Sequence, residues 1–325
     1  MAGLGRIGLA VLGLIFALLS AVRAEEPALR IALLKTGTVN WEVDVIRHHG
    51  LDRANGFRLE VLEMAGNPAA QIAFQGGEAD VIVSDWIWVA RQRAAGRDFV
   101  FLPYSKAVGG LMVPAASPVG KLADLRGQKV AIAGGPLDKS WLILRAYAAR
   151  TEGFDLASET EQVFGAPPLV FQQAKAGEVA AAINFWHFMA KMRAAGMRDL
   201  ISVAAAAQAL GLDPETPLLG YVLSGALLRD KPELVRGLAD ASRQAKALLA
   251  TSDEEWARIR PLMNAGSDAE FAALVAGYRE GIPSGAPVDE AAAAKLLALM
   301  AELGGEELVG TATTLPEGVF VQPGS

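Results

Sequence analysis

The stretch from Pro68 to Trp86 constrains the fold more than any other part of the sequence. Its pattern predicts a helix that begins at a proline, stops at Gly76-Gly77, and is followed by the short strand Val81-Ile82-Val83. An apolar, β-branched run of this kind is typical of a strand buried in a parallel sheet. Ligands of open α/β sheets bind just beyond the carboxyl ends of such strands. Ser84, Asp85 and Trp86, which come next, are therefore the first candidates for contact with a ligand.

The segments on either side repeat this alternation of strands and helices. Strands are expected at 30–34, 57–64, 99–102 and 111–114, with helices at 42–48 and 90–95 between them. This order builds a doubly wound parallel sheet. Side chains that follow two of these strands join the candidates, namely Asn40, Trp41 and Tyr104.

A second block of the same kind begins near residue 117. A strand at 130–133 runs through Gly134-Gly135 into a helix at about 142–149. Glycines between a strand and a helix start expose backbone N–H groups to a polar or anionic ligand group. The loop lacks the Gly-Lys-Ser/Thr of a P-loop, which argues against nucleotide binding. This loop and the end of the next strand, at 178–183, supply the remaining candidates: Asp138, Lys139, Ser140, Trp141, Asn184, Trp186 and His187.

The N-terminus has the pattern of a secretory signal peptide. Arg6 precedes an apolar run at 7–19, and Val22 and Ala24 occupy the small-residue positions of a signal-peptidase site. A membrane anchor is the alternative, but the run is short for a bilayer span and Arg23 follows it. We therefore expect a signal peptide at 1–24, cut after Ala24, and a protein in the periplasm without membrane insertion after cleavage. The chain has 0 Cys, so it offers no lipid attachment and no disulfide.

The charge of the chain argues against nucleic-acid binding. The chain has 30 Lys and Arg residues against 36 Asp and Glu, and two of the arginines leave with the signal. The mature balance of 28 against 36 is a net charge of −8. An acidic chain without a basic block does not suit a phosphate backbone. The roughly 300 remaining residues are enough for one large or two medium domains.

Three blocks of the sequence carry a family resemblance. They are Gly76-Gly77-Glu78-Ala79-Asp80 with the strand after it, the segment 122–132, and the segment 176–182. In this order they resemble the periplasmic substrate-binding proteins of ABC importers, in the nitrate/sulfonate/taurine (NitT/TauT, SsuA/THI5-like) family. The resemblance runs from about 30 to about 249. The chain departs from the family at Ala180, where an Asp is frequent, and at 184–187, where Trp-Glu-Pro is common.

The resemblance implies a type II periplasmic binding protein with two doubly wound α/β lobes and a ligand cleft between them. Lobe 1 would be discontinuous, 25–112 plus 223–325, and lobe 2 would be 113–222. The implied function is capture of a small organic solute by Venus-flytrap closure of the lobes, then delivery to an ABC permease and its ATPase. The partners would be that solute and the permease, the protein would be a monomer, and no cofactor is implied.

The tryptophans that follow predicted strands have two interpretations. Trp41, Trp86, Trp141 and Trp186 either line the cleft and stack on a flat or cationic solute, or pack in the core as tryptophans usually do.

The charged candidates are also ambiguous. Lys35, Lys106 and Lys139 would neutralise an anion such as a sulfonate, or are solvated surface lysines. Asp85 and Asp138 would accept from an amine or a ring N–H, although Asp138 is also placed to cap a helix. An aromatic or heterocyclic solute with polar edges fits this mixture best, and a sulfonate-like solute is the alternative.

Two other functions stay open. A periplasmic enzyme would use Asp85 or His187 as acid or base, and a ligand sensor would dock on a signalling receptor instead of a permease. The sequence has no G-x-S-x-G, no H-E-x-x-H and no cysteine nucleophile. His48 and His49 are adjacent and do not share a helix face, and His187 is the only other histidine, so no metal site is expected.

Overall fold

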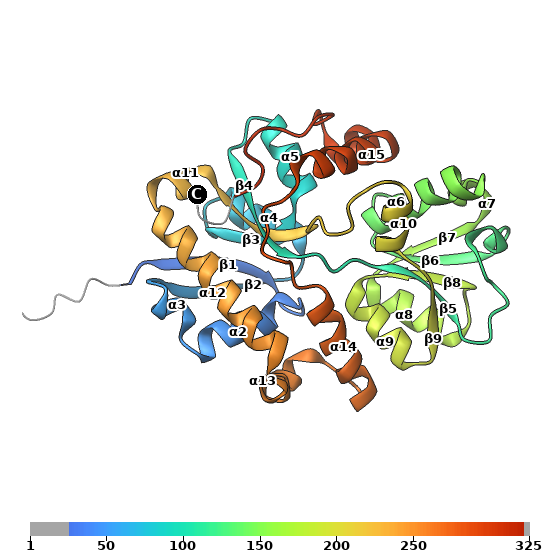
Figure 1. The fold of residues 1–325 in the computed structure, drawn as a ribbon, viewed down its shortest axis with the longest axis horizontal. Coiled ribbons are helices and arrows are strands. Elements are labelled where there is room, and N and C mark those ends of the chain that lie inside the picture. Colours follow the sequence, from blue (N-terminus) through green and yellow to red (C-terminus); the bar gives the residue numbers. More distant parts are fainter. Residues whose placement is uncertain (1–25, 322–325) are drawn as a thin grey trace, which may run out of the picture.

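The computed structural model describes residues 26–321, which form two lobes that lie side by side (Figure 1). Each lobe is built on a five-stranded sheet. The signal peptide expected at 1–24 lies outside the described residues. Strands and helices alternate as the sequence predicts, because apolar strands that are buried on both faces need helices to cover them.

The sheet of lobe 1 has the strand order β2-β1-β3-β10-β4. Strand β1 is parallel to both β2 and β3, whereas β10 is antiparallel to both β3 and β4. The strands are β1 (Ala28–Leu34), β2 (Arg58–Met64), β3 (Val81–Asp85), β4 (Phe99–Ser105) and β10 (Leu219–Ser224). The helices are α2 (Val39–His48), α3 (Leu51–Ala54), α4 (Asn67–Gln75), α5 (Trp86–Ala94), α11 (Gly225–Asp230), α12 (Pro232–Thr251), α13 (Asp253–Ile259) and the 3-10 turn η3 (Arg260–Met263).

The sheet of lobe 2 repeats this plan in the order β7-β6-β8-β5-β9. Strand β5 is antiparallel to β8 and β9, and the other pairs are parallel. The strands are β5 (Gly110–Pro114), β6 (Lys129–Ala133), β7 (Glu161–Gly165), β8 (Ala181–Asn184) and β9 (Met197–Ser202). The helices are α6 (Lys139–Tyr147), α7 (Leu156–Glu159), α8 (Pro167–Ala176), α9 (Trp186–Ala194) and α10 (Val203–Ala209), with short turns η1 (Leu122–Leu125) and η2 (Ala148–Glu152).

The expected lobe boundaries at 112/113 and 222/223 fall inside two strands. Strand β5 belongs whole to the sheet of lobe 2, and β10 belongs whole to the sheet of lobe 1. Each is the antiparallel strand that enters a lobe from the other side. Its apolar pattern is that of any buried strand, and this pattern does not tell which of two sheets the strand joins.

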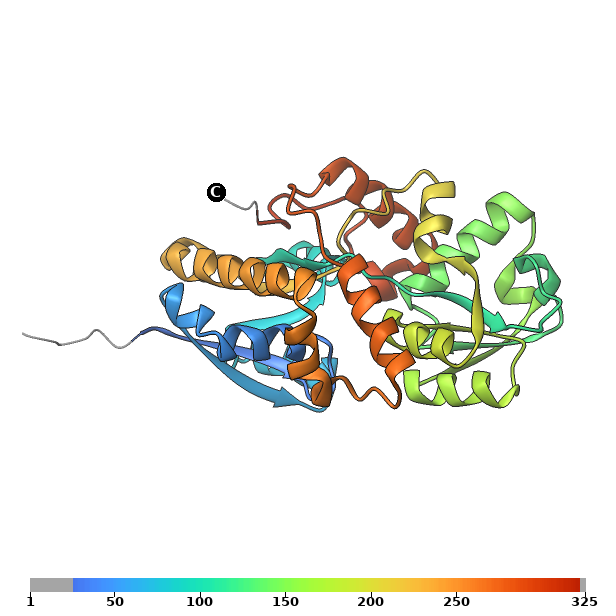
Figure 2. The ribbon, with the colours of Figure 1, turned by 60° about the horizontal axis from the view of Figure 1, so that its bottom comes forward.

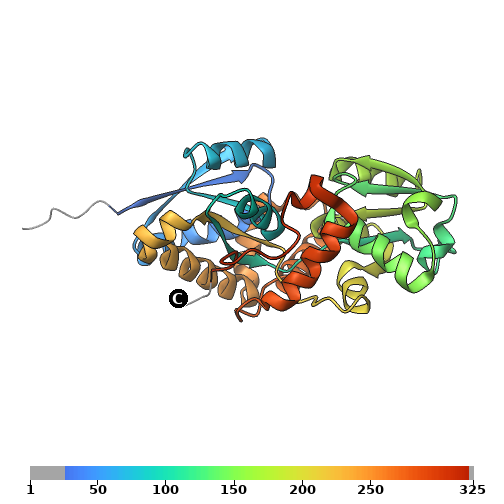
Figure 3. The same ribbon diagram turned by 90° about the horizontal axis from the view of Figure 1, so that it is seen from above.

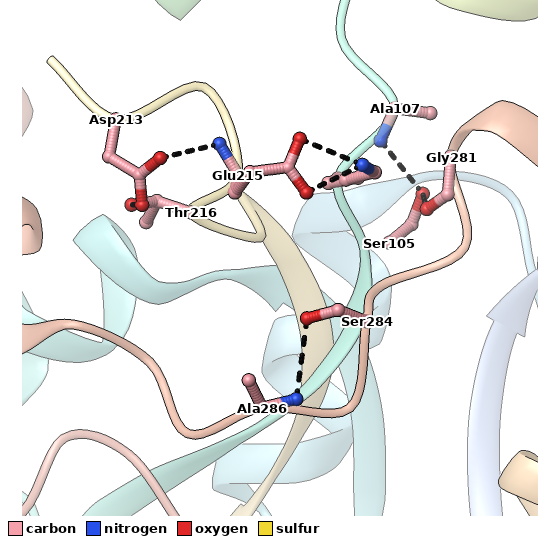
Figure 4. A network of polar contacts seen from close by, with 9 residues as sticks. Ser105, Ala107, Asp213, Glu215, Thr216, Gly281, Ser284 and Ala286 are labelled. Atoms are coloured by element: carbon pink, nitrogen blue, oxygen red, sulfur yellow. Dashed lines mark hydrogen bonds and ion pairs between the residues drawn. The ribbon is translucent and has the colours of Figure 1, made fainter.

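Two segments pass between the lobes, and a third runs beside them (Figure 4). They are 106–109 between β4 and β5, 210–218 between α10 and β10, and 281–289 between two C-terminal helices. Lys106 Nζ donates to Glu215 Oε2 at 2.7 Å, and the Lys106 backbone N–H donates to Gly281 O at 3.0 Å. A Cβ on Gly281 would lie only 2.6 Å from Ala107 Cβ, so this close approach requires glycine. We call these three the linking segments.

The C-terminal helices α14 (Asp268–Glu280) and α15 (Glu290–Val309) lie at the junction of the lobes. Figure 2 shows α14 standing beside the helices of lobe 2, and Figure 3 shows α15 across the front of the junction. Helix α14 packs on α9, and α15 packs on both α5 and α6. After α15 the chain returns to lobe 1, where Val321 N–H donates to Phe101 O at 2.8 Å and covers part of β4.

Candidate ligand cleft

Loops from the carboxyl ends of the parallel strands of both sheets meet at the junction of the lobes. In lobe 1 they follow β1 and β3, and in lobe 2 they follow β6 and β8. Direct contacts join the two sides, from Asp85 to Lys139 and from Trp41 to Trp186. This is the edge at which open α/β sheets bind ligands, and most of the predicted site residues lie along it.

The first contact across the junction, the polar contact, joins Asp85 to Lys139. Asp85 Oδ2 lies 2.9 Å from Lys139 Nζ, and Asp85 Oδ1 accepts from the Trp88 backbone N–H at 2.9 Å as the N-cap of α5. Burial lowers the pKa of Lys139, but the attraction of Asp85, its hydrogen bond and nearby Asp138 outweigh this, and the net shift is upward. Lys139 therefore stays charged, and its charge is matched by a carboxylate of the other lobe.

Asp138 fills the capping role that the sequence allowed. Its side chain accepts from the Trp141 backbone N–H at 3.0 Å and closes the first turn of α6. Burial raises the pKa of Asp138, and the capping bonds and Lys139 oppose that shift. A side chain held in this way shapes the start of α6, and the structure favours the capping role over ligand binding.

The second contact, the aromatic contact, places Trp186 of lobe 2 on Trp41, Tyr278 and Gly277. The rings of Trp186 and Trp41 are perpendicular, with centroids 6.0 Å apart, and the Tyr278 ring lies 6.5 Å away. Gly277 faces the indole so closely that a Cβ there would lie 3.0 Å from Trp186 Cε3. Trp186 is half-buried, and it is the candidate tryptophan that the lobes share.

The other three candidate tryptophans are packed in the core. Trp41 is 4% exposed, Trp86 0% and Trp141 2%. Trp86 lies against Phe320 with ring centroids 5.6 Å apart, and its Nε1 has no hydrogen-bond partner within residues 26–321. The packing interpretation therefore holds for these three side chains in this form of the protein, because each helix start on which they lie turns the ring inward.

The two candidate asparagines hold loops in place. Asn40 Nδ2 donates to Leu34 O at 2.8 Å and Gly37 O at 2.9 Å. Asn184 is buried, donates from Nδ2 to Pro167 O at 3.0 Å, and accepts from the Phe185 backbone N–H. These bonds fix the loops after β1 and β8, which position Trp41 and Trp186.

The remaining candidates differ in burial. Ser84 and Ser140 are half-buried at the cleft edge, whereas Tyr104 is only 3% exposed. His187 is half-buried beside Trp186. Burial, helped by the charge of Lys191, lowers the pKa of His187 to about 4, so its imidazole is neutral near pH 7.

The sequence analysis missed a buried polar network behind the aromatic contact. Glu42 is 0% exposed, and its carboxylate accepts from the hydroxyls of Tyr221 at 2.8 Å, Ser242 at 2.6 Å and Tyr278 at 3.0 Å. The fourth donor is the Lys246 ammonium. Burial lowers the pKa of Lys246, although Glu42 opposes the shift. We call these five residues the buried network.

A weak sequence signal for this network existed. Glu42 lies among the apolar residues of α2, and Ser242 and Lys246 continue the row of Leu238 on the apolar face of α12. Two charges on apolar helix faces are each costly when alone, and they become acceptable as a pair. This pattern indicates that each buried charge has a partner, but it does not identify the partner residue.

A small cavity remains between the aromatic contact and the linking segments. Its volume is about 10 Å³, room for roughly one water molecule. Side chains of both lobes and of the linking segments line it: Thr38, Tyr104, Ser105, Ala107, Trp186, Leu219, Lys246, Tyr278, Gly281 and Ile282. The lobes are in contact beside this cavity, which is too small to hold an organic molecule.

Within residues 26–321, no group of three or more His, Asp or Glu side chains is placed to hold a metal ion. None of the helices described there combines the length and apolar character needed to cross a membrane.

Comparisons with known proteins identify the fold. A family described as NMT1/THI5 like matches residues 46–255, more than half of the chain. The aliphatic sulphonate-binding protein SsuA of Escherichia coli has a similar structure, with a TM-score of 0.68 at 21% identity, covering 89% of this chain and 97% of that one. No curated protein matches the chain.

Two further solved structures have a similar fold. The alkanesulfonate-binding SsuA of Xanthomonas axonopodis pv. citri, bound to MOPS, has a TM-score of 0.66 at 18% identity and covers 92% of this chain and 99% of its own. The desulfurization enzyme DSZB has a TM-score of 0.54 at 15% identity, covering 90% and 97%. The predicted fold, a type II periplasmic binding protein with two α/β lobes, is confirmed.

Proposed function

The chain belongs to the NMT1/THI5-like family, and from this premise we propose that it is the solute-binding component of an ABC importer. It captures a small organic solute between its lobes and delivers it to a membrane permease with its ATPase. The junction of the lobes carries the proposal, because Asp85 and Lys139, and Trp41 and Trp186, come from different lobes. Contacts that exist only when the lobes are together let a bound solute select the closed form.

The solute is aromatic or heterocyclic, with a sulfonate-like solute as the alternative. Trp186 supports the first class, because its half-buried indole faces the junction. Lys139, at the N-terminus of α6, supports the second. An anion at Lys139 would, however, have to replace Asp85 and leave that carboxylate without its partner. The ring-bearing solute therefore has the better support.

The location follows from the same proposal. The protein works in the periplasm as a monomer, after its signal peptide is cut behind Ala24. N-terminal sequencing of protein recovered from the periplasm should then begin at Glu25. A mature chain that still carries Met1 contradicts this part of the proposal.

An enzyme is the rival function, since a desulfurization enzyme shares the fold. Two side chains would have to serve as acid or base, and neither is well placed. Asp85 is engaged by Lys139 and by the start of α5. A pKa of about 4 makes His187 a weak base near neutral pH. A ligand sensor has the same site and differs only in the partner that it docks on.

Native mass spectrometry of the protein purified from periplasm tests the proposal. We expect a retained small molecule that leaves unchanged on unfolding and that quenches tryptophan fluorescence when it is added back. A converted product would establish the enzyme instead. Co-purification with a signalling receptor rather than a permease would establish the sensor.

A further inference from the structure

The cavity beside Trp186 is mostly apolar, but several polar side chains take part in its lining. Thr38, Tyr104 and Lys246 are three of the six lining side chains that carry hydrogen-bond donors, and the others are Ser105, Trp186 and Tyr278. The inference below rests on the proposed function, because it requires the lobes to part and admit a solute.

Among these donors, the Tyr104 hydroxyl gives the strongest indication of a bound ligand. Tyr104 is 3% exposed, and its hydroxyl has no hydrogen-bond partner within the described residues. The Tyr278 hydroxyl lies beside that of Tyr104, but it donates its own proton to Glu42 at 3.0 Å. A buried hydroxyl without a protein partner can bond a molecule that enters the cavity, and such a bond would offset the cost of its burial.

Lys246 adds a donor without adding net charge. Two of its ammonium protons are accounted for by Glu42 and Ser242, and the ammonium lies 4.1 Å from the centre of the Tyr104 ring. Glu42 balances the charge of Lys246. Glu42 and Ser242 thus hold the ammonium at the cavity wall while the site stays neutral overall.

Thr38, at the start of α2, is the third of these donors. Its side chain makes no capping bond to that helix, although it occupies the N-cap position. A threonine hydroxyl at an N-cap ordinarily accepts from the first turn. Here the hydroxyl remains available to the cavity that Thr38 lines.

We propose that Thr38, Tyr104 and Lys246 form the polar end of the solute site and receive a neutral oxygen acceptor, such as a carbonyl, carried on a flat ring. The ring lies between Trp186 and Tyr278, which part to admit it and close on it again. A neutral acceptor is preferred because Glu42 already balances Lys246. In this closed form the cavity of about 10 Å³ is too small for a ring, so the solute enters when lobe 2 carries Trp186 away.

Calorimetric titration with benzamide tests the assignment. Benzamide presents a neutral carbonyl on a flat ring, and benzylamine presents a cation on the same ring. We expect benzamide to bind the wild type and benzylamine to show no measurable binding. Tyr104→Phe should weaken benzamide binding about tenfold, because it removes one donor and keeps the ring.

Tyr221→Phe is the matched control. It removes a hydroxyl from the same buried network, but Tyr221 does not line the cavity. It should lower the unfolding midpoint and keep benzamide affinity within about twofold. Tyr104→Phe should keep or raise the midpoint, since the hydroxyl it removes has no partner. A purely structural Tyr104 cannot give this opposite pair of results.

Three results would overturn the inference: no binding of benzamide, equal binding of benzamide and benzylamine, or equal loss of benzamide affinity in both tyrosine variants. The proposed function is judged separately by the molecule that the protein retains from periplasm. A retained solute whose binding is indifferent to Tyr104→Phe would refute this site and leave the solute-binding function intact. Protein that retains nothing and whose lobes never move in solution would refute the function itself.

Discussion

The two contacts across the junction have opposite physical character. The polar contact is a single ion pair whose side chains are 29% exposed at Lys139 and 18% at Asp85. The aromatic contact places Trp186 on Trp41, Tyr278 and Gly277, with the fully buried Glu42 behind them. Water and salt weaken the first, whereas the second depends on shape and on a core that holds its shape.

This difference indicates separate tasks for the two contacts. An ion pair that is partly wet can part and reform at small cost, because water hydrates both ions when the lobes open. An indole seated on a glycine and two rings has few alternative positions. We therefore expect the aromatic contact to set the geometry of closure and the polar contact to adjust its equilibrium.

The largest effect should follow from removing the support of the aromatic contact. Glu42→Gln leaves the Lys246 ammonium buried without its counter-charge, and this should destabilise the protein by about 3–5 kcal/mol. Urea unfolding measures the change. Replacing both partners, with Glu42→Gln and Lys246→Met together, should recover part of the loss. Additive losses in the double variant would show that the two groups do not stabilise each other.

A smaller effect is expected from filling the space that Gly277 leaves for Trp186. In Gly277→Val, the new Cβ would lie 3.0 Å from Trp186 Cε3. This close contact keeps the lobes from closing fully. Overpacking of this kind costs about 1–3 kcal/mol. Small-angle X-ray scattering should show a larger radius of gyration for the variant. In a Trp186→Ala background, Gly277→Val should change the radius of gyration very little. If Gly277→Val alone leaves the radius of gyration unchanged, Trp186 does not need the space beside Gly277 for closure.

The polar contact should yield a smaller effect still. Lys139→Gln removes the ion pair and is expected to shift the closing equilibrium by about 0.2–1 kcal/mol, less at high salt. Asp85→Asn should do the same, because asparagine still caps α5. Scattering at low and high salt compares the variants. If the double variant opens the lobes much further than either single one, Asp85 and Lys139 act independently.

The sequence was sufficient where a feature depends on neighbouring residues. The β-branched run at 81–83 forms β3, and Asp138, just before a helix, is its N-cap. Strand β7, by contrast, was not predicted, because Glu161–Gly165 lies at the edge of its sheet and mixes polar with apolar side chains. An edge strand lacks the continuous apolar pattern of a central one.

The sequence was insufficient where a feature depends on distant partners. Glu42 and Lys246 are 204 residues apart, and their pairing depends on how α12 packs on α2. The tryptophans were correctly expected near helix starts after strands, but the direction of each ring depends on its neighbours. Trp86 is buried because Phe320 returns over it, whereas Trp186 faces the other lobe. Local pattern places a residue along the cleft edge and does not say which way it points.

The smallest effect at neutral pH concerns His187, which lies beside Trp186. Its pH dependence also separates the aromatic contact from the polar contact. Its pKa is about 4 in the folded protein and about 6.5 when unfolded, so the unfolded chain takes up the proton first as the pH falls. Its contribution to stability is complete above pH 6.5 and is lost progressively towards pH 4. His187→Gln should match the wild type at pH 7.5 and lose less melting temperature between pH 6.5 and pH 4.

His48→Gln is the control for this pH dependence, because His48 is exposed. It should follow the wild-type curve of melting temperature against pH. Charging His187 draws it towards water and should loosen Trp186, on which it packs, before the more distant polar contact responds. Tryptophan fluorescence of the wild type should therefore change below pH 6.5, and the same change in His187→Gln would assign it to another group.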